Sequence, residues 1–514
     1  MTPRAAERIV RALCVPVALF AATLPAVASL GGDVVGEAAL ATTELDVERA
    51  ARLLDQVDVD TPRVAMERAR LSLYRGDCEA AAAILSAPNR HVNDEARQLW
   101  ELAESCAGAT VSAMIVHDER RGVSVRVQDE RDQPLAPVIT DVAVKVRDAL
   151  RRDLGVALPR PLRIDLVRDL FSLSAVTGLP LKAAETTGTV AVARWGRVTM
   201  ISPRATALGY PWEDTLAHEM THLAVTRASG DRAPLWLQEG VAKRLETRWR
   251  AARPHDGEPP ADLIAHRALV TGQSVGIDRL GPSIAMLPTP EAASTAYAEV
   301  QSFIRFFVAR QGEPALRLLF MDLRGLEGAD VDRALEGATG YLLPQWITLF
   351  EHDLVARYGK VPKPLGEGPT FQKHEARSIV RWIRLGDLLM GDGKPLPASE
   401  LFQRAREKDP GSAPIRWREA RALLMNQEPE RAERALGGVE DLDVVHGAWY
   451  ALFGRFGGAG GRREAAERAF SLGIAVDPLF DEVACEGRLR SESELPSKPA
   501  RQRLCVAARQ IPRE

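Results

Sequence analysis

Residues 217–246 of this 514-residue chain, AHEMTHLAVTRASGDRAPLWLQEGVAKRLE, decide its fold. The stretch contains His218 and His222, four residues apart, with Glu219 next to the first of them. Residues at positions i and i+4 share one helical face, so both imidazoles can converge on a single metal ion. Glu219 is offset by one residue and can face a water molecule held by such an ion. The alternative is a pair of polar helix residues without a ligand.

The second half of the stretch supplies a further ligand. Gly230 is suited to end the first helix and Pro234 to open the second. Glu239 lies on this second helix, and two neutral imidazoles with one carboxylate leave a zinc ion an open fourth position for water. Gly240, beside Glu239, is expected to permit close approach between the two helices. The neighbouring apolar residues are expected to pack in the core: Trp236 and Leu237.

These motifs resemble a known family. HEMTH (218–222), a spacer of sixteen residues and WLQEGVA (236–242) are similar to the gluzincin zinc metallopeptidases. More narrowly, they resemble the peptidase MA-like domains found in exported bacterial proteins beside tetratricopeptide repeats. The resemblance covers residues 111–362 and implies a zincin-like α+β fold that binds Zn²⁺ and hydrolyses peptide bonds. It also implies His218, His222 and Glu239 as the metal ligands and Glu219 as the catalytic base.

Two further roles follow from this chemistry. A peptidase needs a group that stabilises the oxyanion, and Tyr297 is the candidate because it lies near the start of the helix expected to roof the cleft. The alternative for Tyr297 is a core aromatic residue. Related gluzincins carry an acidic residue one turn beyond the third ligand, which orients a histidine, but this chain has Lys243 there. Asp214 or Glu246 can take over that role.

The residues before the motif are rich in β-branched side chains and predict a small sheet. The expected strands are VSVRVQD (123–129), RIDLV (163–167) and a pair within VAVARWGRVTMIS (190–202), with a helix at 141–154. The strand near 196–202 is expected to be an edge strand that aligns an extended peptide by main-chain pairing. Apolar-periodic helices follow to about residue 357, and the Pro- and Gly-rich segment 359–370 predicts a linker.

Residues 363–514 carry a 34-residue period. Asp409-Pro410 and Asp477-Pro478 lie two periods apart, with Asp443 at the midpoint. Small and large apolar residues recur in the same register: Ala398, Ala432 and Ala466; Phe402, Leu436 and Phe470; Leu389 and Leu423. This pattern resembles tetratricopeptide repeats, which bind partner proteins or pack against a neighbouring domain. Residues 29–110 predict a helical region of the same type, because small residues flank the Gly76-Asp77 turn.

The N-terminus resembles an export signal. Residues 1–28 contain Arg4, Arg8 and Arg11, then an apolar run of about 13 residues, then Ala26-Val27-Ala28. This order predicts a cleaved signal peptide and a periplasmic or secreted protein without an integral membrane segment. The alternative is a membrane anchor, for which the run is shorter than the ~20 residues that a bilayer requires.

Export changes how the cysteines are interpreted. Cleavage removes Cys14 and leaves four cysteines, for which three connectivities exist. Local pairing, Cys78 with Cys106 and Cys485 with Cys505, is the simplest and would place the second disulfide in the C-terminal tail. Each disulfide would contribute about 3 kcal/mol in an oxidising compartment. The alternative is four buried thiols.

The remaining features exclude some classes of function. A net charge of −3 provides no basic surplus for nucleic acid. FGGAGG (456–461) lacks the spacing of a dinucleotide-binding loop. The other histidines are scattered singly: His91, His117, His255, His266, His352, His374 and His446. The sequence thus favours an exported zinc metallopeptidase acting on a peptide or protein. The alternative is a non-catalytic periplasmic repeat scaffold with a structural or degenerate zincin domain.

Overall fold

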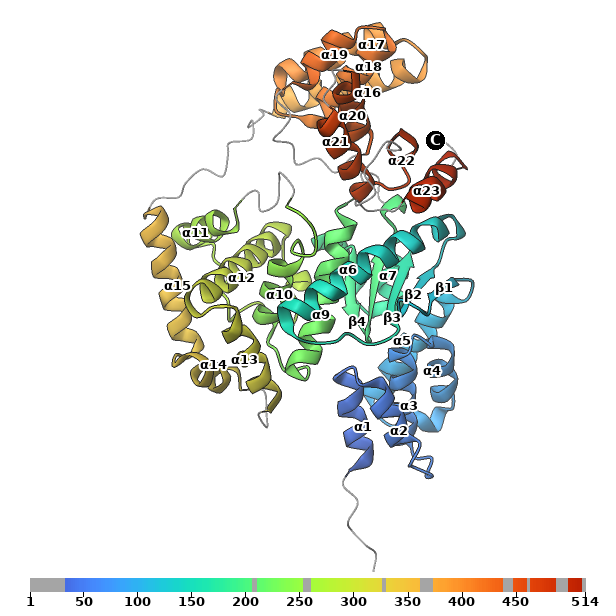
Figure 1. Ribbon diagram of the computed structural model, residues 1–514, viewed down its shortest axis with the longest axis vertical. Coiled ribbons are helices and arrows are strands. Elements are labelled where there is room, and N and C mark those ends of the chain that lie inside the picture. The colour runs from blue at the N-terminus through green and yellow to red at the C-terminus, as the bar shows by residue number, and fades with distance from the viewer. Residues whose placement is uncertain are drawn as a thin grey trace, which may run out of the picture.

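The computed structural model describes residues 33–205, 210–252, 260–325, 330–360, 373–437, 447–459, 463–486 and 498–510. The expected signal peptide, most of the expected linker and Asp443 lie outside these ranges. Within them, no helix is both long enough and apolar enough to cross a membrane. Most of the described chain is helical, with one small sheet near the middle (Figure 1).

The sheet is mixed and has five strands in the order β1-β2-β3-β5-β4. Its strands are β1 (Met114–Asp118), β2 (Val123–Val127), β3 (Leu162–Val167), β4 (Ala191–Arg194) and β5 (Arg197–Ile201). The central strands β2, β3 and β5 run parallel, and the edge strands β1 and β4 run antiparallel to their neighbours. The strands expected at 123–129, 163–167 and within 190–202 are confirmed, whereas β1 was not predicted.

The expectation that residues 196–202 form an edge strand is wrong. β5 pairs with β3 on one side and with β4 on the other, so β4 is the edge. Trp195 and Gly196 both have positive φ angles, which gives the tight two-residue turn of a β-hairpin. The hairpin therefore returns β5 into the sheet interior and leaves β4 outside.

Different helices cover the two faces of the sheet. On one face lie α6 (Ala136–Leu154), which includes the helix expected at 141–154, and α9 (Trp212–Ser229). The other face packs against α7 (Leu170–Thr177) and the N-terminal helices, which share a buried apolar cluster with Val167 and Ile201. α8 (Leu181–Thr187) leads from α7 to β4. The sheet is thus buried between two helical layers.

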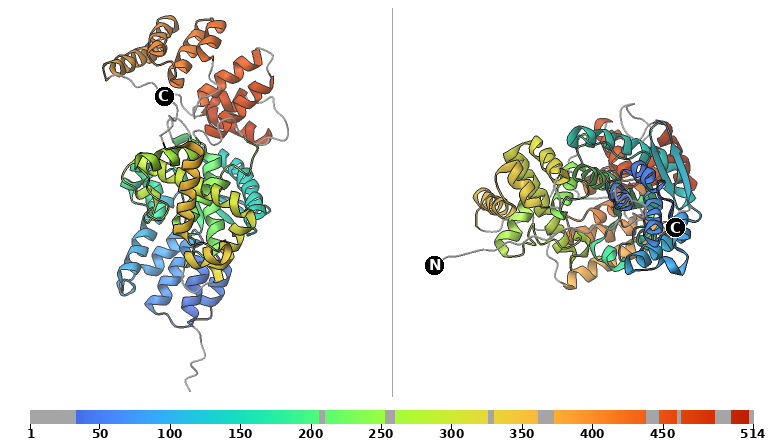
Figure 2. Two further views of the ribbon diagram at one scale, coloured as in Figure 1. Left: turned by 90° about the vertical axis from the view of Figure 1, so that its left-hand side faces the viewer. Right: turned by 90° about the horizontal axis from the view of Figure 1, so that it is seen from below.

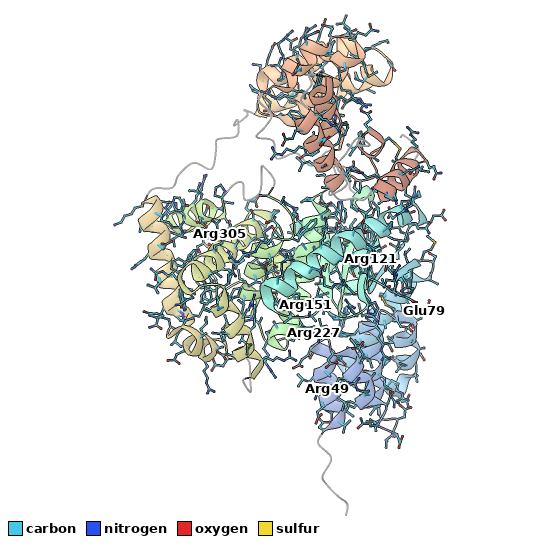
Figure 3. All side chains as sticks on the ribbon, viewed as in Figure 1. Arg49, Glu79, Arg121, Arg151, Arg227 and Arg305 are labelled. Atoms are coloured by element: carbon cyan, nitrogen blue, oxygen red, sulfur yellow. A yellow bond between two sulfur atoms is a disulfide. The ribbon has the colours of Figure 1, made fainter. Side chains whose placement is uncertain are left out.

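The N-terminal helices are held together by a disulfide and are joined to the sheet domain by hydrogen bonds. They are α1 (Val34–Thr43), α2 (Val47–Leu54), α3 (Pro62–Tyr74), α4 (Cys78–Leu85) and α5 (Asp94–Thr110). The expected disulfide Cys78–Cys106 joins α4 to α5. Arg227, labelled in Figure 3 near the end of α9, donates to the Leu45 carbonyl oxygen at 2.6 Å. This region therefore packs against the sheet domain.

A lobe of helices follows α9. It comprises α10 (Leu235–Leu245), α11 (Ala261–Thr271), α12 (Pro290–Gln311), α13 (Glu313–Gly325), α14 (Val331–Thr339) and α15 (Leu343–Tyr358). α12 is its central helix, because it contacts α10, α11, α13 and α15. The last of these helices ends at Tyr358, close to the boundary expected at about 357.

The C-terminal helices form a repeat array. They are α16 (Lys373–Gly391), α17 (Pro395–Lys408), α18 (Ala413–Met425), α19 (Pro429–Leu436), α20 (Gly447–Ala459), α21 (Arg463–Val476), α22 (Asp481–Glu486) and α23 (Lys498–Gln510). α17, α19 and α21 begin at residues 395, 429 and 463, which confirms the 34-residue period. The expected disulfide Cys485–Cys505 joins α22 to α23. The views in Figures 1 and 2 agree that this array and the N-terminal helices lie at opposite ends of the sheet domain.

The repeated residues pack helix against helix. Ala398, Ala432 and Ala466 are buried, as are Phe402, Leu436 and Phe470. A Cβ atom at Gly386 would clash with the ring of Phe402, and one at Gly454 would clash with the ring of Phe470. In these two repeats, 68 residues or two periods apart, a large side chain thus packs against a glycine of the preceding helix.

The array also predicts a pH dependence of stability. Burial raises the pKa of Asp477, at the end of α21, from 3.8 to about 6. The folded state then holds the proton more tightly than the unfolded chain, so stability falls as the pH rises from about 4 through about 6. A shift of two pKa units corresponds to a loss of at most about 3 kcal/mol. We expect Asp477→Asn to match the wild type near pH 4 and to melt at a higher temperature at pH 7.5.

Thermal unfolding between pH 4 and 7.5 measures this effect. Asp148→Asn is the control, because the Asp148 side chain is 61% exposed, and it should follow the wild type at every pH. Equal melting temperatures for Asp477→Asn and the wild type at pH 7.5 would contradict the prediction.

Candidate metal centre

The helix α9 carries the first two candidate ligands between a buried face and the lobe. Its core-facing residues are at most 4% exposed: Leu216, Ala217, Met220, Leu223 and Ala224. Gly230, with a φ of 64°, ends the helix, and Pro234 precedes α10, as expected from the sequence. Trp236 and Leu237 are buried in the core, also as expected. α9 and α10 therefore form the predicted pair of helices.

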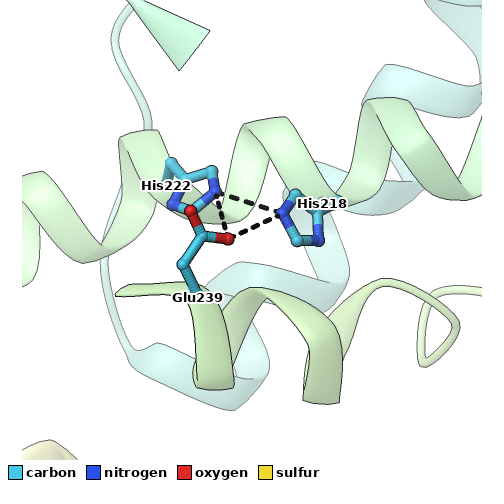
Figure 4. Close-up of side chains that lie close together, drawn as sticks. All are labelled: His218, His222 and Glu239. Carbon is cyan, nitrogen blue, oxygen red and sulfur yellow. Dashed lines mark hydrogen bonds and ion pairs between the residues drawn. The ribbon is translucent and has the colours of Figure 1, made fainter. Parts of the chain in front are cut away.

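The three candidate ligands come together at one point (Figure 4). His222 Nε2 lies 3.2 Å from His218 Nε2. Glu239 Oε2 lies 3.3 Å from His218 Nε2 and 3.6 Å from His222 Nε2. Four-coordinate zinc with bonds of about 2.0–2.1 Å separates neighbouring ligand atoms by about 3.3 Å. The side chains of this chain thus have the spacing of one triangular face of a zinc tetrahedron.

The polar atoms also fit a metal ion. Glu239 Oε2 is buried. Among the described residues, none donates a hydrogen bond of acceptable distance and angle to it. A buried carboxylate oxygen without such a partner is costly unless a cation satisfies it. His218, Glu219 and Glu239 are 8–9% exposed, so the centre is almost enclosed by protein.

Both histidines are held through their other ring nitrogen. His218 Nδ1 lies 3.1 Å from Glu246 Oε2, and His222 Nδ1 lies 3.4 Å from Gln238 Oε1. A proton on Nδ1 leaves the lone pair on Nε2, which is the nitrogen that faces the centre. Of the two carboxylates that the sequence left open, Glu246 is therefore the one that orients His218.

The second carboxylate, Asp214, is used elsewhere. It lies in the first turn of α9 and accepts hydrogen bonds from Arg250 Nε at 2.7 Å and Nη2 at 2.5 Å. It also accepts one from Trp249 Nε1 at 3.2 Å. Asp214 thus fastens the chain after α10 to the start of α9.

The charges of this cluster favour a cation at its centre. Burial lowers the pKa of His218, but the carboxylates of Glu239 and Glu246, 3.3 Å and 3.1 Å from its ring nitrogens, outweigh burial and raise the pKa to about 10. Burial raises the pKa of Glu239, but the nearby His222, His218 and Lys243 lower it by more. The pKa therefore lies below its usual value, and this carboxyl stays ionised. Either a proton on His218 or a metal ion therefore balances the carboxylates.

Glu219 is fixed by the edge strand. Its Oε2 accepts a hydrogen bond of 2.6 Å from the Ala193 backbone N–H in β4. Main-chain groups alternate in direction along a strand, so the outward N–H of Ala193 marks the unpaired edge of β4. Sequence reasoning missed this contact and the Gln238–His222 contact, because neither backbone direction nor side-chain reach between elements can be read from a motif.

Tyr297 lies beside the centre on α12. Its ring centroid is 6.3 Å from that of His218, and Lys243 Nζ lies 6.0 Å from the Tyr297 ring centroid. Burial, together with the carboxylates of Glu239, Glu219 and Glu246, raises the pKa of Tyr297 well above 10. The phenol therefore keeps its proton and can donate a hydrogen bond. The two expectations for Tyr297 are not exclusive, since this partly buried residue also packs against the core.

Gly240 permits a close approach of helices, but the helix that approaches is not the predicted one. A Cβ atom at position 240 would meet Ile304 and would lie 2.7 Å from the Val300 carbonyl oxygen, both on α12. The close approach is therefore between α10 and α12, and not between α9 and α10. Tyr297 lies one turn before Val300, so this contact brings it close to the ligands on α9 and α10.

Gly240→Ala is expected to destabilise the protein by about 1–3 kcal/mol, because the backbone oxygen of Val300 cannot move aside. Chemical unfolding of the full chain measures the change. Gly108→Ala is the matched control: Gly108 lies inside α5 with no neighbouring atom within 4 Å of a Cβ placed there. That substitution should be neutral or stabilising by up to about 1 kcal/mol. A neutral Gly240→Ala would contradict the prediction.

Comparison with known proteins supports the repeat array. A family model described as Tetratricopeptide repeat matches residues 389–454, which run from the end of α16 into α20. Repeats of this kind suggest an interaction with another protein. Neither a curated protein nor a solved structure matches the chain.

The other histidines do not join the centre where the structure describes them. His266 is buried and its Nε2 lies 2.8 Å from the Gly359 carbonyl oxygen. His91 Nε2 lies 2.7 Å from the Leu85 carbonyl oxygen, and its ring packs on Trp100. His255 and His446 lie outside the described residues.

Proposed function

We propose that residues 111–362 form a zinc metallopeptidase domain of the gluzincin type. The observation that carries the proposal is the spacing of His218 Nε2, His222 Nε2 and Glu239 Oε2, which lie 3.2–3.6 Å from one another. The donor set, the unpaired oxygen of Glu239 and the two oriented imidazoles all fit Zn²⁺.

Each residue around the centre then has a role. Zinc, when bound, supplies a water of lowered pKa and polarises a carbonyl group. Glu219 accepts a proton from that water at Oε1, while its Oε2 stays hydrogen-bonded to Ala193. It later returns the proton to the leaving amine. The Tyr297 hydroxyl donates to the oxygen that becomes negative in the transition state.

The substrate is proposed to be a peptide in extended conformation. β4 is the edge of the sheet, and the Ala193 amide links this edge directly to Glu219. A peptide added beside β4 would pair with main-chain groups and place a scissile bond near the candidate base. The strand that aligns the peptide is then β4, and not residues 196–202.

We also propose that the protein is exported. The two disulfides are compatible with an oxidising compartment such as the periplasm or the exterior. The sequence order of residues 1–28, basic then apolar then small, supports delivery by a signal peptide.

Zinc content and hydrolysis test the proposal together. The mature chain should contain one zinc ion per molecule and cleave an unstructured protein, and a chelator should stop the cleavage. A chain that cleaves equally well after zinc removal, or that binds no zinc, would refute the proposal.

A second function is favoured by the repeat match. The array over residues 389–454 supports binding of a protein partner, either as a substrate-delivery surface or as the sole activity of a scaffold. A stable partner recovered equally by the wild type and by Glu219→Gln, with no proteolysis by either, would support the scaffold over the peptidase.

A further inference from the structure

Lys243 and Glu246 form a short relay that leads to a candidate metal ligand. Lys243 Nζ lies 2.7 Å from Glu246 Oε1, and Glu246 Oε2 lies 3.1 Å from His218 Nδ1. The two carboxylate oxygens thus have different partners, one cation and one imidazole. Lys243 lies in the last turn of α10 and Glu246 is its C-cap residue, so both groups come from the helix that carries Glu239.

The three side chains of this relay are partly buried, so an unpaired charge among them would be costly. The side chains of Lys243, Glu246 and His218 are 28%, 19% and 11% exposed. A Glu246 carboxylate without a counterion would be poorly solvated at this depth. A lysine at position 243 balances this charge, whereas an acidic residue there would add to it.

The neighbouring basic residue does not share this task. Arg244 Nη2 donates to Glu313 Oε1 at 2.5 Å, at the first residue of α13. Lys243 is also placed near the ring of Tyr297, which links the relay to the candidate oxyanion donor. The two consecutive basic residues of α10 therefore serve different parts of the domain.

We propose that Lys243 is a positioning residue of the metal centre: it holds Glu246 so that Glu246 fixes the ring and tautomer of His218. The inference rests on the proposed function, because it assigns how one ligand of that centre is oriented. It replaces the orienting acid expected at position 243 by a carboxylate one turn later on α10, supported by a lysine. Lys243 is then part of a working site and no mark of a degenerate one.

The test measures zinc affinity of the full mature chain by competition with a chromophoric chelator. Removal of an orienting partner typically weakens metal affinity 10- to 100-fold. We expect this loss for Glu246→Gln and a loss of about 10-fold for Lys243→Met. Lys243→Arg keeps the cation and should stay within about 3-fold of the wild type. Arg244→Met is the matched control and should retain wild-type affinity.

The visible spectrum of the cobalt-substituted protein gives a second readout, because it reports the ligand geometry and not the fold alone. Lys243→Met and Glu246→Gln should change it, whereas Lys243→Arg and Arg244→Met should not. Wild-type affinity and spectrum in Lys243→Met would overturn the inference, even if Glu246→Gln binds zinc weakly. An equal loss in Lys243→Met and Arg244→Met would also overturn it. Absence of zinc binding by the wild type would instead refute the proposed function.

Discussion

Glu219→Gln is expected to lower peptide hydrolysis by about 10²- to 10⁴-fold while zinc stays bound, since that range is typical for the loss of a general base. The glutamine side chain can still accept the Ala193 N–H through its amide oxygen, so the contact to β4 is retained. Glu219 is no candidate ligand, and the spacing of the three ligand atoms does not involve it. The substitution therefore removes the proton acceptor and leaves the metal site and the fold in place.

Initial rates on an unstructured protein and zinc content per chain measure this effect on the same samples. Glu336→Gln is the control, because Glu336 is an exposed residue of α14 and should leave both values unchanged. Cleavage by Glu219→Gln at the wild-type rate would assign the hydrolysis to another group or to a contaminant. Loss of zinc from Glu219→Gln would contradict the separation of base and ligands.

The ligands could be predicted from the sequence because their geometry is local. His218 and His222 share a helical face, and a short turn returns the chain to Glu239, so the spacing alone nearly determines the distances. The orienting groups depend on longer side chains and on how helices pack. The sequence left Asp214 and Glu246 as alternatives, and the contacts of Glu246 with His218 and of Asp214 with Arg250 separate them.

The limits of the fold prediction have a similar origin. The β-branched residues of β2, β3 and β5 predict strands because these strands are largely buried. β1 alternates between exposed and half-buried positions and contains His117, so its apolar signal is weak. The edge strand was mispredicted because it depends on where the β4–β5 hairpin docks, which the local pattern does not encode. The 34-residue period, in contrast, is a direct record of packing, and the starts of α17, α19 and α21 follow it.

The N-terminal helices show why repeat-like sequence does not imply a separate domain. The sheet face beneath them carries Arg197, which is fully buried, and Asp165, which is 4% exposed. Arg197 Nε lies 3.0 Å from Asp165 Oδ2, and Arg197 Nη1 donates to the Leu73 carbonyl oxygen at 2.6 Å. Leu73 is in the last turn of α3, at the negative end of the helix dipole, which attracts cations. A buried arginine thus joins the sheet to the N-terminal helices.

Asp165→Asn is expected to destabilise the protein by about 3–5 kcal/mol, the usual cost of leaving a buried charge without its partner. The asparagine keeps the size of the side chain, so the loss comes from the uncompensated guanidinium of Arg197. Arg126 Nε, 3.9 Å from Asp165 Oδ1, loses a counterion as well and adds to the cost. The double variant Asp165→Asn with Arg197→Met should recover part of the stability, because it removes the unpaired charge.

Urea unfolding of the full chain measures these differences in the free energy of unfolding. They are taken from the transition in which the sheet domain unfolds. Glu101→Gln is the control: Glu101 is 60% exposed and lies 4.0 Å from Arg97 on α5, and such surface pairs contribute less than about 1 kcal/mol. If Asp165→Asn costs no more than Glu101→Gln, the buried pair does not hold the N-terminal helices to the sheet. If the double variant is less stable than Asp165→Asn alone, the contact of Arg197 with the Leu73 carbonyl outweighs the cost of its unpaired charge, and the helix end is the stronger link between the two regions.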